Sequence, residues 1–282
     1  MTAAGRGTGP GPGPDHDRVA GRVAVVTGAS RGLGAGLALH FAGEGMRLGL
    51  CARHRPVLAA RTRPTARDGH VDPSEVPVLS AVDVTDRGVL ARFAATVVAR
   101  FGRIDLWVNN AGLLGPIGPL AGPAAADPAE IARTIDVNVT GVLNGTAVFA
   151  EHVRTREGTG TLVNISSGAA TNPYEGWAAY CASKAAVDQL TRVVALEEAR
   201  HGLAAYAVSP GLVDTEMQAA IRATDRASFP QVDRFRRAAT EHRFNSPAWV
   251  AEHVLALAFG LERPGTVVVR VPDQAVPSGL AG

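Results

Sequence analysis

The hydrophobic positions of the chain alternate between short β-branched runs and longer segments with helical spacing. The runs predict β-strands at residues 22–26, 47–52, 78–82, 104–108, 160–165, 204–208 and 266–271. Helices are expected at 33–44, 87–101 and 178–200. Strands that alternate with crossover helices indicate an α/β fold. We expect one domain over residues 19–282, built on a doubly wound parallel sheet of about seven strands.

Two stretches depart from this alternation. Residues 1–18 contain three Gly-Pro pairs and no apolar run, so a disordered tail is expected rather than a signal peptide. A rigid proline-rich docking segment is the alternative. Prolines also interrupt residues 53–78, and because proline disrupts a helix interior, any helix there should be short and lie within 56–63.

A glycine-rich run separates the first predicted strand from the first predicted helix. It reads Thr-Gly-Ala-Ser-Arg-Gly-Leu-Gly over residues 27–34. Glycine-rich turns alone are common. A strand, a tight turn and a helix N-terminus in this order are typical of a dinucleotide site, in which the helix N-terminus faces the pyrophosphate.

Tyr180 and Lys184 lie four positions apart, and Ser167 precedes the tyrosine by 180 − 167 = 13 positions. Positions i and i+4 share a helix face, so the phenol and the amine can point into one pocket. A nearby ammonium lowers the pKa of a phenol and suits it to acid–base chemistry, while a serine hydroxyl can hold a substrate oxygen. Together with the glycine run, these residues predict hydride and proton transfer at a carbonyl.

Composition narrows the class of protein. The net charge is only +2, and no Lys/Arg block suggests nucleic-acid binding. The two cysteines, Cys51 and Cys181, do not predict a disulfide framework, and no Cys or His has metal-ligand spacing. No run is long and apolar enough to span a membrane. We therefore expect a reduced, cytoplasmic protein without a metal.

The ordered motifs resemble the short-chain dehydrogenase/reductase family over residues 20–272. The matching positions are the run at 27–34, Asp83-Val84, Asn109 to Gly112, Asn138, Ser167, Tyr180, Lys184, and Pro210-Gly211 with Thr215. The resemblance implies a Rossmann fold and an oxidoreductase that uses a nicotinamide cofactor on CH–OH or C=O groups.

The resemblance also implies which residues bind the cofactor. The phosphates and ribose would be lined by Gly28, Ser30, Arg31, Gly32, Leu33 and Gly34. The adenine would contact Asp83 and Val84, and the adenosine ribose would be flanked by Asn110, Ala111 and Gly112. The carboxamide end would be held by Pro210, Gly211, Val213 and Thr215.

Four residues would be catalytic by the same resemblance. Tyr180 would donate the proton, and Ser167 would orient the substrate oxygen. Lys184 would lower the tyrosine pKa and bind the nicotinamide ribose, and Asn138 would support a relay water. Two alternatives stay open: Asn138 only caps or bends its helix, or Ser166 faces the substrate, although the spacing to the tyrosine favours Ser167.

The end of the second strand predicts NADP(H) rather than NAD(H). NAD sites usually place an acid there, but residues 50–55 contain none. Arg53 follows the expected acidic position, and Arg31 lies in the glycine run. Two guanidinium groups suit a 2′-phosphate. Alternatively, both arginines are merely solvated in an Arg-rich chain.

Residues 214–246 are expected to fold over the substrate as a lid. The segment from Pro210, with Phe229-Pro230 further on, is similar to sepiapterin reductases and the benzil-reductase-like group, which implies a vicinal diketone substrate. Tyr174 and Trp177 would form an aromatic wall, or else belong to the core or an interface. The broad apolar surface of the 178–200 helix, together with the family's habit of pairing it and the 136–155 helix with their twins, implies a homodimer or homotetramer.

We therefore expect an NADPH-dependent carbonyl reductase that acts on a small molecule. Alcohol oxidation, or a ketoreductase step in secondary metabolism, is the alternative within the enzyme class. A non-catalytic NADP-sensing protein is the alternative outside it, and the intact Ser167, Tyr180 and Lys184 argue against a sensor.

Overall fold

The computed structural model describes residues 16–57, 76–261 and 263–275. The predicted tail at 1–18 therefore lies almost entirely outside the described residues. So does most of the short helix predicted within 56–63.

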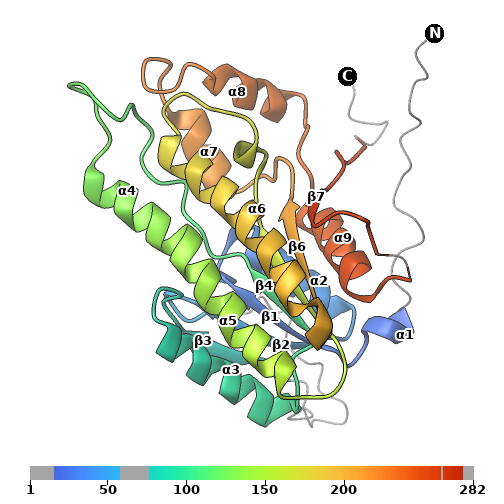
Figure 1. Cartoon of the computed structure of the whole chain (residues 1–282). Helices are drawn as coiled ribbons and strands as arrows, with labels where there is room; N and C mark the ends of the chain where they lie inside the picture. Colours follow the sequence, from blue (N-terminus) through green and yellow to red (C-terminus); the bar gives the residue numbers. More distant parts are fainter. Residues whose placement is uncertain (1–15, 58–75, 262, 276–282) are drawn as a thin grey trace.

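One parallel sheet forms the centre of the described structure (Figure 1). Its strands are β1 (Val23–Thr27), β2 (Arg47–Ala52), β3 (Val78–Ala81), β4 (Leu106–Asn109), β5 (Gly160–Ile165), β6 (Leu203–Ser209) and β7 (Val268–Arg270). The strands lie in the order β3-β2-β1-β4-β5-β6-β7. From β1 to β3 the chain adds strands on one side of β1, and from β4 onward it adds them on the other side, so the direction of winding changes between β1 and β4. The predicted doubly wound sheet is confirmed. Ligands of such sheets bind beyond the carboxyl ends of the strands at this reversal.

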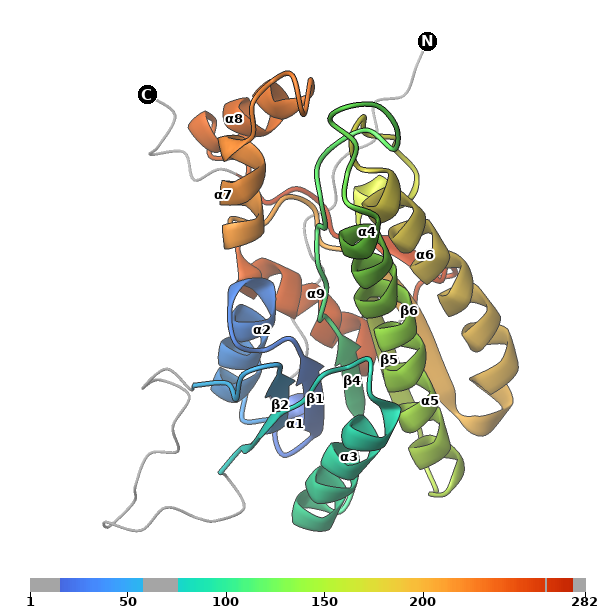
Figure 2. The ribbon, with the colours of Figure 1, turned by 90° about the vertical axis from the view of Figure 1, so that its left-hand side faces the viewer.

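Helices cover both faces of the sheet (Figure 2). One face carries α2 (Gly32–Gly43) and α9 (Pro247–Phe259), with α1 (His16–Val19) beside them. The other face carries α3 (Arg87–Phe101), α5 (Gly141–Arg154) and α6 (Ala178–Glu198). Three shorter helices, α4 (Pro128–Ile135), α7 (Glu216–Ala223) and α8 (Val232–Thr240), lie toward the carboxyl ends of the strands.

The sheet is buried on both faces, as a parallel sheet with helices on each side requires. All five residues of β1 are buried, and side chains of alternate positions enter different apolar clusters. Leu37 and Phe41 of α2 pack in the first cluster. Trp107 of β4 stacks on Phe149 of α5 in the second, with ring centroids 5.9 Å apart. Packing of the two clusters on the sheet fixes the positions of the strands, and therefore of the residues at their carboxyl ends.

One predicted helix begins earlier than expected. Instead of starting at residue 136, it starts at Pro128, where Asp127 accepts a hydrogen bond from the Ala129 N–H at 2.9 Å. An aspartate cap followed by proline is a strong helix start. The helix then passes through a π-helical turn at Asp136–Thr140 into α5.

The edges of the sheet also differ slightly from the prediction. The strand expected at 104–108 forms at Leu106–Asn109. Just before it, the Asp105 carboxylate accepts the Val23 N–H at 3.0 Å. The last strand is limited to Val268–Arg270. The predicted lid segment, residues 214–246, contains α7 and α8. In the described residues, no helix is long and apolar enough to cross a membrane.

Candidate active site

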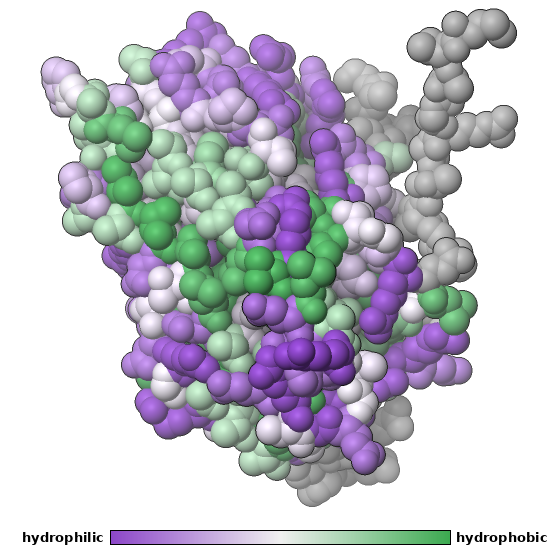
Figure 3. Space-filling view, viewed as in Figure 1, coloured by the Kyte–Doolittle hydropathy of each residue, from purple (hydrophilic) through white to green (hydrophobic). Residues whose placement is uncertain are grey.

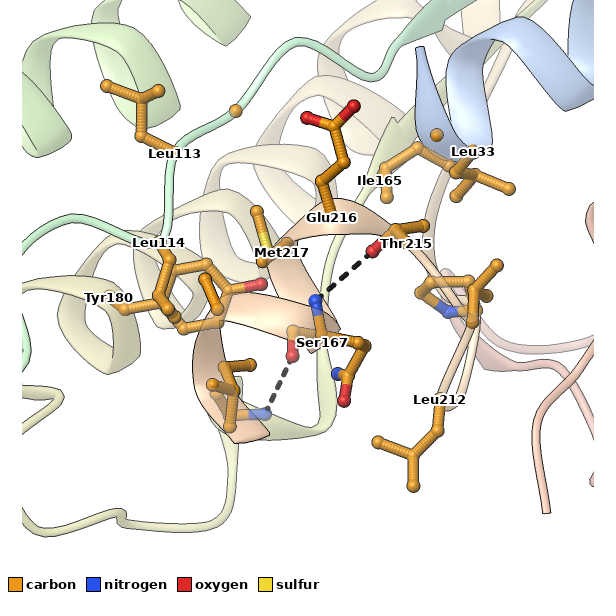
Figure 4. Close-up of a pocket in the computed structure, with 18 of the residues that line it drawn as sticks. Leu33, Leu113, Leu114, Ile165, Ser167, Tyr180, Leu212, Thr215, Glu216 and Met217 are labelled. Atoms are coloured by element: carbon orange, nitrogen blue, oxygen red, sulfur yellow. Dashed lines mark hydrogen bonds between the residues drawn. The ribbon is translucent and has the colours of Figure 1, made fainter. Parts of the chain in front are cut away.

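A cavity of about 1580 Å³ opens beyond the carboxyl ends of the strands. Every residue that the sequence analysis assigned to the cofactor lines it, as do Ser167, Tyr180 and Lys184. Figure 4 shows Tyr180 beside Leu114 and Met217, with Ser167 and Leu212 in the lining of the same cavity. The lining also includes Leu113, Ile117 and several α8 residues that the sequence analysis did not assign.

The glycine run has the geometry of a phosphate cradle. Gly28 and Gly32 have φ of +67° and +56°, which favour glycine. A Cβ on Gly34 would stand 2.4 Å from both the Asn110 amide nitrogen and the Gly28 carbonyl oxygen. Among the described residues, no side chain caps the α2 N-terminus, so its N–H groups can donate hydrogen bonds to an anion. These features fit a dinucleotide pyrophosphate.

Asn110 supports this loop from the end of β4. Its side chain donates to the carbonyl oxygens of Thr27 (2.9 Å) and Gly28 (3.3 Å). The Thr27 hydroxyl in turn accepts the backbone N–H groups of Asn110 and Ala111, at 3.0 and 3.1 Å. The Asn110 amide group therefore positions the glycine loop, in addition to any ribose contact.

Asp83 and Arg53 lie at the adenosine end of the cavity. The Asp83 carboxylate accepts the Thr85 N–H at 3.0 Å and the Thr85 hydroxyl at 2.8 Å. The backbone hydrogen bond from Thr85 is the main cause that lowers the Asp83 pKa, and the charge of Arg53 adds to it. Asp83 is thus an ionised acceptor, as an adenine amino group requires. Arg31 instead pairs with Glu216 at the start of α7.

Ser167 and Tyr180 lie near each other at the catalytic end of the cavity. Ser167 follows β5 and also accepts the Ala169 N–H at 3.2 Å, while Tyr180 lies in the first turn of α6. Burial raises the pKa of the Tyr180 hydroxyl, and the hydrogen bond with Ser167 acts in the opposite direction. The pKa-lowering effect of Lys184 on this tyrosine stays a prediction.

Lys184 is almost completely buried below the tyrosine. Its ammonium donates to the Ile165 carbonyl oxygen at 2.8 Å and lies 5.7 Å from the Tyr180 ring centroid. Burial lowers the pKa of Lys184 to about 8, although the charge of Asp188 opposes this shift.

The two neighbouring serines have different partners. The Ser166 hydroxyl donates to the buried carboxylate of Asp188, one helical turn beyond Lys184. The Ser167 hydroxyl interacts with Tyr180. This difference favours Ser167 as the serine that holds the substrate oxygen.

Asn138 is fully buried and lies behind the cavity lining, in the π-helical turn. Its amide group donates to the Leu113 carbonyl oxygen (2.8 Å) and the Ser183 hydroxyl (3.0 Å), and accepts the Leu113 N–H at 2.8 Å. Asn138 therefore joins the segment after β4 to the start of α6. Its predicted support of a relay water stays a prediction.

An aromatic cluster borders the other end of the cavity. Trp177 meets Tyr180 edge-on, with centroids 5.7 Å apart, and stacks on Phe229 at 4.8 Å. Tyr174 and Phe235 pack against the same indole ring at 4.8 and 5.4 Å. Tyr174 and Trp177 thus both line the cavity and pack against lid residues of their own chain.

The family model described as short chain dehydrogenase matches residues 22–226. The chain belongs to the short-chain dehydrogenase/reductase family. It is 32% identical to a benzil reductase ((S)-benzoin forming) of Bacillus subtilis strain 168, an alignment that covers 83% of this chain and 91% of that protein. It is 35% identical to an NADPH-dependent pterin aldehyde reductase of Arabidopsis thaliana, over 71% and 78% of the two chains.

The fold is shared with solved members of the family. The KRED1-Pglu enzyme superposes with a TM-score of 0.72 at 29% identity, over 88% of this chain and all of that one. This short-chain dehydrogenase/reductase is therefore an oxidoreductase that acts on CH–OH or C=O groups of small molecules with a nicotinamide cofactor.

Proposed function

We propose that this protein is a cytoplasmic NADPH-dependent carbonyl reductase. The observation that carries the proposal is the placement of Ser167, Tyr180 and the buried Lys184 together in the lining of the glycine-loop cavity. Two free cysteines, Cys51 and Cys181, are consistent with a reducing compartment.

The residues around the cavity divide the reaction between them. NADPH, when bound, supplies the hydride to the carbonyl carbon. The Ser167 hydroxyl donates a hydrogen bond to the carbonyl oxygen, and the Tyr180 hydroxyl gives that oxygen its proton as negative charge develops. The Lys184 ammonium stabilises the tyrosinate that remains, until a proton from solvent restores the phenol. A secondary alcohol and the oxidised cofactor are the products.

Replacing Tyr180 tests this assignment. In Tyr180→Phe the proton donor is lost but the ring still packs against Trp177, so we expect turnover to fall at least about 100-fold. NADPH binding, measured by calorimetry, should stay within about threefold of wild type. Undiminished reduction of every carbonyl in Tyr180→Phe would refute the mechanism.

The preference for NADPH is proposed from the adenosine end. Ala52 ends β2 without an acid, and the exposed Arg53 lines the cavity there. Charge-assisted contacts to a phosphate contribute about 1.5–3 kcal/mol. Arg53→Ala should therefore lower kcat/KM for NADPH about 10- to 100-fold without a matching loss for NADH. Arg55→Ala, exposed but outside the cavity lining, is the control.

The substrate is proposed to be a vicinal diketone, reduced at one carbonyl. The similarity to benzil reductases and the aromatic wall of Tyr174 and Trp177 support this choice. With NADPH, 1-phenyl-1,2-propanedione should be reduced with a higher kcat/KM than acetophenone. Equal values would argue for a different ketone class.

We also propose a homo-oligomer that pairs α5 and α6 with their twins. Leu143 on α5 is 45% exposed, and Val193 and Leu196 on α6 are 40% and 84% exposed. Figure 3 shows hydrophobic residues gathered over the face on which these helices lie. Light scattering of Leu196→Glu should show a smaller particle than wild type.

A further inference from the structure

Helix α8 presents one face to the cavity. The lining residues are Arg234, Phe235, Arg237, Ala238 and, just beyond the helix, Glu241. Their spacing (i, i+1, i+3, i+4 and i+7) places them along a single side of a helix. Two guanidinium groups therefore border the same space as the apolar Phe235 and Ala238.

Most arginines near the lid form an ion pair with an acid. Arg222 pairs with Asp214 at 3.0 Å, and Arg226 with Asp233 at 2.7 Å. Asp233 also forms an ion pair with Arg236 at 3.4 Å, and Glu241 forms one with Arg243 at 3.4 Å.

Arg234 and Arg237 differ from these neighbours. Within the described part of the chain neither forms an ion pair, although both line the cavity. The α8 face of the cavity thus carries two positive charges that no described carboxylate neutralises.

A row of rings connects these charges to the catalytic tyrosine. The Arg234 guanidinium lies over the Tyr174 ring, 5.9 Å from its centroid. The Tyr174 ring lies 4.8 Å from Trp177, and Trp177 lies 5.7 Å from Tyr180. A flat substrate on this wall can therefore place its carbonyl at Tyr180 and its other end at α8.

We infer that the enzyme prefers aromatic ketones with a carboxylate at the end distant from the reacting carbonyl. Arg234 and Arg237 would bind that carboxylate, because a guanidinium forms charge-assisted, often bidentate bonds to it. The aromatic wall would bind the ring between the two ends. This inference rests on the proposed carbonyl reduction.

A matched pair of substrates tests the charge alone. The pair is 1-(4-carboxyphenyl)-1,2-propanedione and its methyl ester, assayed with NADPH at low salt. Wild type should reduce the acid with at least about tenfold higher kcat/KM than the ester. Arg234→Gln and Arg237→Gln should each reduce this acid-to-ester ratio several-fold, and the double variant should abolish it.

The control is Arg226→Gln, which changes a lid arginine outside the cavity lining and should keep the wild-type ratio. Salt at 0.5 M should lower the ratio, because ions screen the charges. An acid-to-ester ratio near one in wild type, or a ratio that both cavity variants leave unchanged, overturns the inference while the reductase assignment stands.

A binding measurement separates the inference from the proposed function. Biphenyl-4-carboxylate and its methyl ester carry no reducible ketone, and their affinities can be measured by calorimetry with NADP⁺ present. Tighter binding of the acid that depends on Arg234 and Arg237 supports the anion site even if neither dione is reduced. Equal affinities for acid and ester overturn it.

Discussion

Lys184 is the only lysine in a chain with 28 basic Lys and Arg residues. It lies in the first turns of α6, 6% exposed, with its ammonium directed at a backbone carbonyl. Because burial disfavours the charged form, the pKa of Lys184 falls from 10.5 to about 8. We expect a measured titration near this value in the cofactor-free protein.

The shift has a consequence for stability. The folded state holds the Lys184 proton less tightly than the unfolded chain, so the charged amine destabilises the fold. Moving the pKa from 10.5 to about 8 corresponds to about 3 kcal/mol. This penalty is fully present below about pH 8, and it decreases as pH rises from about 8 toward 10.5.

A lysine labelled with ¹³C at the ε-carbon would report this titration directly. With one lysine in the sequence, the NMR spectrum should contain a single lysine ε signal, which needs no assignment. Its chemical shift should change with a midpoint near pH 8. A midpoint at or above pH 10 would refute the argument that burial dominates over the opposing charge of Asp188.

The stability of Lys184→Met also tests the free-energy cost of burying the Lys184 charge. The variant removes the buried charge but leaves the Ile165 carbonyl without this donor, at a cost of about 1 kcal/mol. It should be inactive, yet about 2 kcal/mol more stable than wild type to urea at pH 7. The advantage should fall by roughly half by about pH 9. A less stable variant at pH 7 would contradict the argument.

Two further substitutions follow from close contacts. Gly34→Ala places a Cβ 2.4 Å from the Asn110 amide and should weaken NADPH binding at least about tenfold by calorimetry, because the loop must shift. Gly43→Ala, at the other end of α2 with open space around it, should bind NADPH like wild type. Asp105→Ala leaves the Val23 N–H without its acceptor and should lower the free energy of unfolding by about 3 kcal/mol in urea.

Local patterns in the sequence were sufficient to predict much of the site. Tyr180 and Lys184 share a helix face, and the glycine run lies directly between a strand and a helix, so neighbours in sequence are also neighbours in space. The parallel sheet then brings the ends of β1, β4 and β5 to one edge. Alternating strands and helices were enough to predict that edge.

Other features depend on contacts that no local pattern encodes. The ion pair of Arg31 with Glu216 joins residues 185 positions apart. Asn138 lies in a π-helical turn, which its sequence does not distinguish from an α-helix. Which side of α8 faces the cavity depends on how residues 214–246 pack over Trp177, and the sequence of α8 alone does not specify this packing. By contrast, the start of α4 at Asp127-Pro128 carries a local signal, because an aspartate cap followed by proline predicts a helix start.

The choice of lysine at position 184 follows from the same physical argument. All the other Lys and Arg residues of this chain are arginines. An arginine side chain, however, stays charged at all accessible pH values. At this buried position an arginine could not lose its charge by releasing a proton. Its planar guanidinium group would also need more hydrogen-bond acceptors than the single carbonyl oxygen of Ile165. A lysine whose pKa falls toward 8 can instead give up a proton near neutral pH. We therefore propose that the buried amine that destabilises the fold also takes part in returning a proton to Tyr180.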